Sequence, residues 1–208
     1  REKTKIKNPN AFWTRAKGGG RGWDGFNRFI TDTTNMFSTG LLPRMIEELK
    51  AMDVDIELHD QRDNLLKYKS VTKLGGLTLR EEQLGSYHAL LTNTVEGIPF
   101  QRGICYEATN SGKNLISATI FKSYPKETCI FLINSTVIYD QAVEEMEELL
   151  PGQIGQICSK MVDLKRYNIA MVQTLRNRIK KDPRLKKWLA SVTVVIVDEA
   201  DEVIARKD

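Results

Sequence analysis

The sequence predicts an α/β fold, in which a parallel sheet with helices on both faces follows a small α+β domain. From residue 77 onward, strand-like stretches alternate with stretches of helical spacing, which is the pattern of a parallel sheet. The strands of this region are almost continuously apolar, which is typical of strands buried on both faces. Residues 1–65 have a different pattern, with one helix and short strands, which indicates a separate α+β unit.

The small domain is expected to cover residues 1–65. A short strand is predicted directly after the glycine-rich loop of residues 18–25. The serine or threonine at positions 38–39 can cap a helix whose apolar residues recur at helical spacing as far as Leu49. Residues 54–58 alternate between apolar and acidic side chains, which predicts a half-buried strand.

The larger domain is expected to cover residues 77–208, after a polar and basic linker over residues 66–76 that ends in two glycines. Its predicted strands are 103–107, 128–134, 168–172 and 192–197. Its predicted helices are a segment containing Leu84 and Leu91, the residues after Lys113, residues 141–150 and a basic stretch that reaches Leu189. We expect Cys105 and Cys129 to be buried in the strands, and the acidic run 144–148 to face solvent.

Length and composition limit the classes of protein to which the chain can belong. A chain of 208 residues is long enough for one or two domains with a core of their own. Its 41% hydrophobic and 28% charged residues argue against wholesale disorder. The apolar stretches are far shorter than the roughly 20 residues that cross a bilayer, and the three cysteines lack the spacing of a disulfide framework or zinc site. We expect a soluble, monomeric protein of the cytoplasm (the host cytoplasm if it is viral), with no membrane partner.

Positive charge is concentrated in two segments of the chain. Residues 1–28 carry a net charge of +6, with tryptophans among the cations, so this arm could contact nucleic-acid phosphates and stack on bases. A solvated segment whose tryptophans pack into a small core is the alternative. A second basic cluster, residues 180–187 beside Trp188, could touch DNA, and a solvated helix is the alternative. The candidate nucleic-acid contacts of the first segment are Lys5, Lys7, Arg15, Lys17, Arg21 and Trp23.

Residues 107–114 lie between a predicted strand and a predicted helix and have the pattern of a phosphate-binding loop. Such a loop needs backbone N–H groups at a helix N-terminus and a lysine that reaches the β- and γ-phosphates. Two positions depart from the general pattern, because Glu107 replaces its first glycine and Asn114 replaces the magnesium-binding serine or threonine. A helix start without a ligand is the alternative. The candidate nucleotide-binding residues of this loop are Thr109, Asn110, Ser111, Gly112, Lys113 and Asn114.

Asp198 and Glu199 come directly after the apolar predicted strand 192–197, and Asp198 lies 85 residues after Lys113. An open α/β sheet places its ligand-binding and catalytic groups at the carboxyl ends of its strands. Asp198, with Asn114, would hold Mg²⁺, and Glu199 would polarise the attacking water. A strand that ends in a polar turn is the alternative. Together with the loop, the acids favour a core that binds ATP and Mg²⁺, with Lys113, Asp198 and Glu199 as the catalytic residues.

The phosphate loop and the acids after the strand resemble those of the superfamily-two helicases, whose motor carries a D-E-x-D/H box like the one that begins at Asp198. Residues 79–83 are similar to the family's L-R-x-x-Q element, which implies that Arg80 and Gln83 select adenine. Two further segments resemble the family's nucleic-acid backbone contacts, although Asn134 and Met171 depart from its usual proline and threonine. The contacts that these segments imply are Ser135, Thr136, Gln173 and Thr174.

The N-terminal segment is similar to the small domain that precedes the motor in UvsW-type bacteriophage recombination helicases. The matching pieces are Asn8-Pro9, Gly22 to Gly25, Phe37, Gly40 to Leu42 and Ile46. The resemblance implies a RecA-like motor domain and an ATP-dependent helicase or translocase acting on branched or single-stranded DNA in replication, recombination and repair. It also implies a second RecA-like domain beyond Asp208, so we expect an N-terminal part of a longer helicase. A degenerate module that binds nucleotide and DNA without turnover is the alternative that Asn114 motivates.

Overall fold

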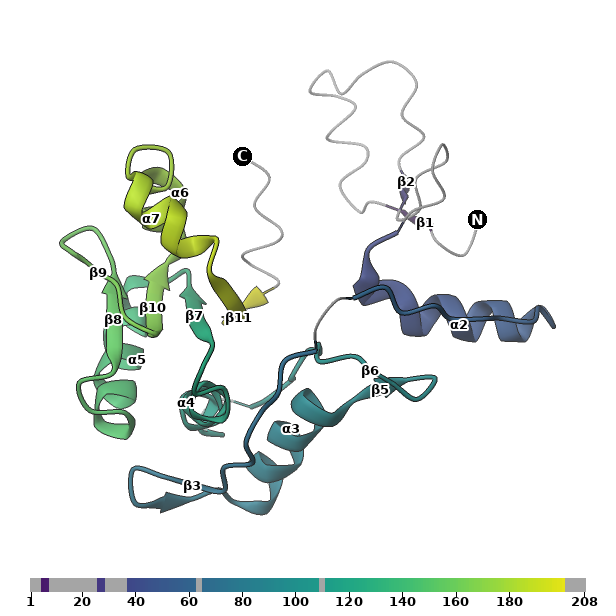
Figure 1. Ribbon diagram of the computed structural model, residues 1–208, viewed down its shortest axis with the longest axis horizontal. Helices are drawn as coiled ribbons and strands as arrows, with labels where there is room; N and C mark the ends of the chain where they lie inside the picture. Colours follow the sequence, from purple (N-terminus) through teal and green to yellow (C-terminus); the bar gives the residue numbers. More distant parts are fainter. Residues whose placement is uncertain (1–4, 8–25, 29–36, 63–64, 109–110, 201–208) are drawn as a thin grey trace. The chain divides into compact units, whose positions relative to one another are not determined.

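The computed structural model describes residues 5–7, 26–28, 37–62, 65–108 and 111–200 (Figure 1). The chain divides into two compact units. The first unit combines Arg1–Arg62 with Thr94–Gly103, and the second combines Asp63–Asn93 with Ile104–Asp208. The domain boundaries expected from the sequence, at residues 65 and 77, stay a prediction. Within the described residues, every helix is too short or too polar to cross a bilayer.

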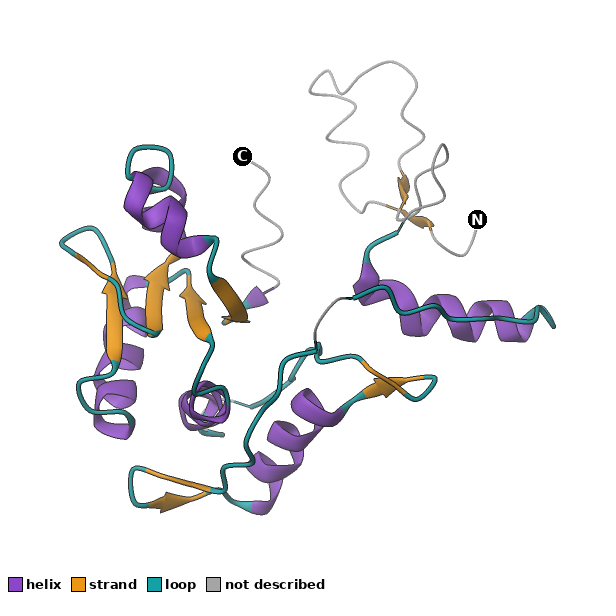
Figure 2. Ribbon diagram, in the orientation of Figure 1, coloured by secondary structure: helices purple, strands orange, loops and turns teal. Residues whose placement is uncertain are grey.

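The second unit contains a five-stranded sheet in the order β11-β7-β10-β8-β9 (Figure 2). The first four of these strands pair in parallel, and β9 pairs with β8 in the antiparallel direction. This arrangement is the parallel sheet predicted from the alternation of strands and helices. The strand bounds are Thr128–Ile133 for β7, Ile154–Ile157 for β8, Val162–Asp163 for β9, Tyr167–Met171 for β10 and Val192–Val197 for β11.

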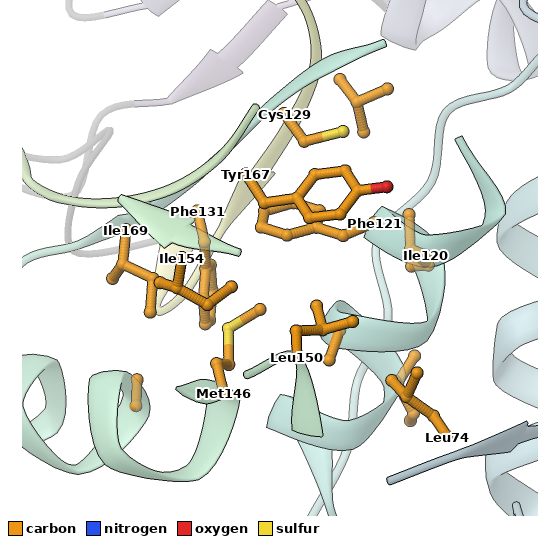
Figure 3. Close-up of a cluster of buried hydrophobic side chains, with 14 of the residues drawn as sticks. Leu74, Ile120, Phe121, Cys129, Phe131, Met146, Leu150, Ile154, Tyr167 and Ile169 are labelled. Atoms are coloured by element: carbon orange, nitrogen blue, oxygen red, sulfur yellow. The ribbon is translucent and has the colours of Figure 1, made fainter. Parts of the chain in front are cut away.

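Helices cover both faces of this sheet. Successive strand residues point to opposite faces, so each strand supplies apolar side chains to both helix layers. On one face, side chains such as Phe131 and Ile169 pack with α4 (Lys113–Ser123) and α5 (Thr136–Leu149). Phe121 of α4 stacks on Tyr167 of β10 with ring centroids 5.5 Å apart (Figure 3). On the other face, α6 (Val172–Arg178) and α7 (Pro183–Leu189) pack against Ile130, Ile157 and Ala170.

Helix α3 (Glu81–Thr92) and the segment before it are attached to α4 through Tyr87. The Tyr87 side chain is fully buried, and its hydroxyl accepts the N–H of Val71 at 2.9 Å and bonds Ser123 Oγ at 2.8 Å. The backbone N–H of Lys69 also donates to the carbonyl of Ser123 at 2.8 Å. The hairpin of β3 (Lys73–Leu74) and β4 (Leu77–Thr78) leads into α3. These contacts fix α3 beside α4, where the candidate site lies.

The first unit has the small α+β composition predicted for the N-terminal residues. Strands β1 (Lys5–Lys7) and β2 (Phe26–Arg28) pair antiparallel, and η2 (Thr39–Leu41) leads into α2 (Leu42–Ala51), the expected helix. A hairpin of β5 (Thr94–Val95) and β6 (Ile98–Pro99) belongs to the same unit. Its Glu96 accepts a hydrogen bond from Lys50 of α2 at 2.8 Å, and its Pro99 carbonyl accepts one from Arg62 at 2.6 Å.

Two predicted strands are wrong. Residues 54–58 form no strand, because no other segment of the described chain lines up beside them to accept a ladder of hydrogen bonds. Residues 103–107 also lie outside every sheet, and Ile104 and Tyr106 are 94% and 100% exposed. Glu107 accepts a hydrogen bond from Ser86, which holds this segment beside α3 instead of at a sheet edge. Cys105 is therefore exposed, contrary to expectation, whereas Cys129 is buried as predicted.

Other elements differ from the sequence prediction in extent. The predicted helix over 141–150 begins earlier, at Thr136. The basic helical stretch is two helices, because Pro183 has no N–H to donate and can only begin a new helix. Of the two predicted caps, Ser38 precedes η2 without a side-chain capping hydrogen bond, and Thr39 is the first residue of η2, so neither is the N-cap of α2. The short strands β8 and β9 were not predicted from their mixed polar and apolar residues.

Candidate nucleotide-binding site

Helix α4 begins at the lysine of the predicted phosphate loop. Its N-cap residue is Gly112, which has the left-handed backbone conformation (φ +87°). Ile116 donates the first intrahelical hydrogen bond, to the carbonyl of Gly112, so the N–H groups of the three preceding residues are not used by the helix. Lys113 is exposed at the same place. A helix start with unused N–H groups and an exposed cation binds anions, phosphate included.

The loop is tied to the first turn of α3. Arg80 Nη2 and Gln83 Nε2 both donate to the carbonyl oxygen of Ser111, at 2.9 and 2.7 Å. Gln83 Oε1 accepts the N–H of Arg80 at 3.0 Å, and this side chain is only 5% exposed. The element that resembles an adenine reader and the loop that resembles a phosphate binder are thus joined by direct hydrogen bonds. An amide can donate twice and accept twice, so Gln83 keeps one donor and one acceptor position.

Gly112 is required at its position for two separate reasons. Its backbone has a positive φ that costs other L-residues about 1–2 kcal/mol. A Cβ added here would also overlap the amide nitrogen of Gln83. The glycine therefore allows the tie between α3 and the loop to form.

Glu107 stands where the general loop pattern has its first glycine, and it too is held by α3. The hydrogen bond from the Ser86 hydroxyl holds the pKa of Glu107 below its ordinary value, and one from the Cys105 thiol acts in the same direction. Arg80, Gln83 and Ser86 recur at every third residue, so they lie along one side of the helix. Ser86 was not singled out from the sequence, although this spacing from Gln83 is a signal that would have found it.

Asn114 is held by α5. Its Nδ2 donates to Glu145 Oε2 at 2.7 Å, and Gln141 Nε2 donates to the other oxygen of the same carboxylate at 2.7 Å. The amide nitrogen is committed to Glu145, so the carbonyl oxygen is the end of Asn114 that can face a cation. The sequence interpretation placed Glu145 on a solvated face. Its partner lies 31 residues away, and no local pattern indicates such a contact.

The two acids follow the end of β11. Asp198 is half-buried, and its N–H donates to the carbonyl of Leu132 at 3.0 Å, which extends the pairing of β11 with β7 by one residue. Glu199 is exposed and has a left-handed backbone (φ +48°). Among the described residues, no hydrogen bond or ion pair joins Asp198 to Lys113 or Asn114.

The residues predicted to contact nucleic acid in the larger domain gather at one edge of the sheet. Ser135 and Thr136 follow the end of β7, and Gln173 and Thr174 follow the end of β10. These strands are parallel neighbours, so both pairs lie at the carboxyl edge, which is also where β11 ends before Asp198. Thr136 and Gln173 are exposed there.

The other predicted residues are less fully described. Lys5 and Lys7 lie on β1. Six residues lie outside the described part of the chain: Arg15, Lys17, Arg21, Trp23, Thr109 and Asn110.

The side chains present suit a cation that arrives with a nucleotide. Within the described ranges, no three His, Cys, Asp or Glu residues are grouped as a metal site. Mg²⁺ keeps several waters and needs only one or two protein ligands when phosphate oxygens supply the rest. The half-buried carboxylate of Asp198 and the carbonyl oxygen of Asn114 are ligands of this kind.

Comparison with known proteins relates the chain to one family and one fold. A model of the family described as the type III restriction enzyme, res subunit, matches residues 76–207. Two crystal structures, of the UvsW helicase from bacteriophage T4 and of T4 UvsW, align with 96% of this chain at a TM-score of 0.66 each, with 14% and 15% identity. The chain spans 74% of the first and 42% of the second. No curated protein matches the sequence. The predicted fold, a RecA-like α/β domain after a small α+β domain, and the resemblance to UvsW-type helicases are confirmed.

Proposed function

The chain belongs to the family described as the type III restriction enzyme, res subunit, and on that premise we propose that it is an ATP-dependent DNA helicase or translocase. Its proposed substrate is branched or single-stranded DNA in replication, recombination and repair. In this proposal residues 77–208 are the first motor domain, residues 66–76 the linker and residues 1–65 a DNA-binding domain. The observation that supports it most directly is the pair of hydrogen bonds from Arg80 and Gln83 to Ser111.

The proposed roles follow from the chemistry of each side chain. Lys113 and the first N–H groups of α4 hold the phosphates, and Gln83 reads the adenine edge with its remaining donor and acceptor. Asp198 and Asn114 supply oxygen ligands for Mg²⁺, and Glu199 orients the attacking water. Bound Mg²⁺ supplies positive charge that offsets the charge of the phosphate oxygens. An arginine from a second RecA-like domain is expected to raise the rate by roughly 10³–10⁵.

The proposed DNA path follows the carboxyl edge of the sheet. Ser135, Thr136, Gln173 and Thr174 contribute hydroxyl and amide groups, which bind phosphate oxygens without reading sequence. The cations of residues 1–28 add attraction for the same backbone.

Replacing Lys113 tests the nucleotide site. Lys113→Ala is expected to abolish binding of a fluorescent ATP analogue and DNA-stimulated ATP hydrolysis by the full-length enzyme, because the side chain that neutralises the phosphates is gone. Lys122→Ala is a matched control, since Lys122 is an exposed lysine in the last turn of the same helix. Circular dichroism checks that both variants fold. Nucleotide binding by Lys113→Ala at the wild-type level would refute the assignment of this loop.

A second candidate function is a module that binds nucleotide and DNA without turnover. It is favoured by Asn114, whose amide oxygen is a poorer substitute for the hydroxyl that usually binds magnesium at this position. Steady-state ATP hydrolysis by the full-length protein separates the two functions. If the enzyme turns over, Asn114→Thr is expected to preserve or raise the magnesium-dependent rate. If the wild type binds ATP but does not hydrolyse it with DNA present, the second function holds.

A further inference from the structure

We infer that the solvent face of α6 and α7 is a second binding surface for the phosphate backbone of DNA, separate from the nucleotide site. This surface, the α6–α7 basic patch, consists of Arg176, Arg178, Lys180, Lys181, Lys186 and Lys187. The inference rests on the proposed function, because it presumes that the chain acts on DNA. It decides between the two interpretations that the sequence left open for residues 180–187 and extends the site to Arg176 and Arg178.

The patch concentrates the positive charge of the larger unit. Residues 172–189 contain seven cations and one acid, for a net charge of +6, whereas the whole chain carries +4. The rest of the chain therefore sums to −2. The single acid, Asp182, uses its carboxylate to cap α7, accepting the N–H groups of Arg184 at 2.9 Å and Leu185 at 3.2 Å, and it lies 3.6 Å from the Arg184 guanidinium. Among the described residues, no ion pair to an acid involves the four lysines of the patch, so their charge is available to a partner.

The opposite side of the two helices is anchored in the core. Leu185 is fully buried and packs with Ile130, Ile157 and Ala170 of the sheet. Leu175 of α6 packs, partly buried, against the same cluster. The apolar sides of the two helices face the sheet, and the five patch cations other than the half-buried Arg178 are exposed on the helices or, for Lys180 and Lys181, in the short turn that joins them. A charge array on rigid elements loses less conformational entropy on binding than one on a loose tail.

Trp188 indicates that the patch does not read bases. Its indole N–H donates to the carbonyl of Lys165 at 3.2 Å, and its ring is partly buried against the second core cluster. It is thus a packing residue and is not available as a stacking platform. Lysine and arginine contacts without stacking or groove insertion bind phosphates irrespective of sequence.

The patch continues the proposed DNA path. Helix α6 starts with Gln173 and Thr174 at the carboxyl edge of the sheet and ends at Arg178, whose Nη2 donates to the carbonyl of Ser159 at 2.6 Å. Seven residues at 1.5 Å each make α6 about 10 Å long, or about three nucleotides of a strand at 3.4 Å each. Lys160, in the turn that follows Ser159, is exposed as well. DNA that contacts Gln173 and Thr174 can therefore reach the cations by running along α6.

The test compares charge-matched variants of the full chain in salt titrations of fluorescently labelled duplex DNA. The patch variant is Lys180→Gln, Lys181→Gln, Lys186→Gln and Lys187→Gln. The control variant, Lys67→Gln, Lys69→Gln, Lys122→Gln and Lys126→Gln, removes the same charge from exposed lysines of the same unit. A third variant replaces the four patch lysines with arginine. Thermal unfolding verifies that each variant is folded.

We expect the patch variant to bind more weakly than the wild type and its log–log salt slope to be shallower by about 2 to 4, at about 0.9 per lost phosphate contact. The control and arginine variants should keep the wild-type slope, and changes of DNA sequence should make no difference. Equal weakening in the patch and control variants, or none in either, would overturn the inference and leave DNA binding elsewhere intact. Loss of binding to phosphatidylserine vesicles but not to DNA would overturn it in favour of a membrane.

A wild-type chain that binds no DNA at any salt concentration would refute both this inference and DNA as the proposed substrate. A wild-type chain that binds DNA but does not bind the ATP analogue would refute only the proposed ATP-driven function. The two failures are therefore distinguishable.

Discussion

Replacing Gly112 with alanine tests how the phosphate loop is held. The structure requires glycine here because of the positive φ and because the amide of Gln83 occupies the space that a Cβ would fill. Gly112→Ala therefore acts on the tie between α3 and the loop as well as on the backbone.

The expected cost has two parts. The left-handed backbone costs alanine about 1–2 kcal/mol. Displacing Gln83 weakens its hydrogen bond to Ser111, and a hydrogen bond of this kind contributes about 0.5–1.5 kcal/mol. Gly112→Ala should therefore lower the free energy of unfolding by about 1.5–3.5 kcal/mol. Gly152→Ala should cost only the first part, because Gly152 has a similar backbone (φ +70°) but nothing within 4 Å of an added Cβ.

Urea unfolding followed by far-UV circular dichroism measures both values. The difference between the two variants isolates the displacement of Gln83 at about 1 kcal/mol. In a Gln83→Ala background this difference should vanish, since the obstructing side chain is gone. A cost for Gly112→Ala that equals the cost for Gly152→Ala in the wild-type background would refute the packing argument.

Three further outcomes follow from other parts of the structure. Cys105 is exposed, whereas Cys129 is buried and its burial raises its pKa to about 12. A thiol reagent should therefore modify Cys105 first and Cys129 only after unfolding. Mass spectrometry of tryptic peptides would report the order of modification. The side-chain hydrogen bond from Arg62 lowers the pKa of Asp60 from 3.8 to about 2. The stabilisation by ionised Asp60 is therefore present above pH 3.8 and is lost as the pH falls through about 2. Asp60→Asn should flatten a plot of the free energy of unfolding against pH between these two values. An added Cβ at Gly155 would overlap Asn168 Oδ1 and lie 2.8 Å from the backbone nitrogen of Lys165, so Gly155→Ala should cost roughly 1–3 kcal/mol, and a cost as small as that of an open-surface glycine would contradict this packing.

Elements with strong periodicity were predictable from the sequence. The strands β7, β10 and β11 are apolar runs, and they were predicted correctly. The helix α3 was predicted from the helical spacing of its apolar residues, and α4 from the Gly-Lys pair at its start. Strand β8 was missed because it is short and contains Gly155, a residue type depleted in strands, followed by the polar Gln156. That glycine is explained by tertiary neighbours: an added Cβ would meet the backbone of Asp163 and Lys165 and the side chain of Asn168 on the neighbouring strand. The Asn168 side chain is held in place by the backbone N–H and carbonyl of Lys165, at 2.9 and 2.7 Å.

The predicted strand over 103–107 failed for a related reason. Alternation and β-branched residues indicate that a segment can pair, but pairing also requires a free edge that the rest of the chain brings alongside. Here Glu107 is bonded to Ser86 of α3, and the segment follows α3 instead of the sheet. The partner of Asn114 was unpredictable in the same way, because Glu145 approaches it only through the packing of α4 against α5.

Helix α3 therefore has more influence on the candidate site than its sequence motif alone suggested. Arg80, Gln83 and Ser86 contact the segment 107–112 at its two ends, through Ser111 and Glu107. Because they lie along one side of a single helix, they move together when the helix moves. A base bound to Gln83 would thus be linked through α3 to the loop that holds the phosphates, without any contact between the base and Lys113. This linkage offers a physical route by which the identity of the base could influence phosphate binding in the proposed ATPase.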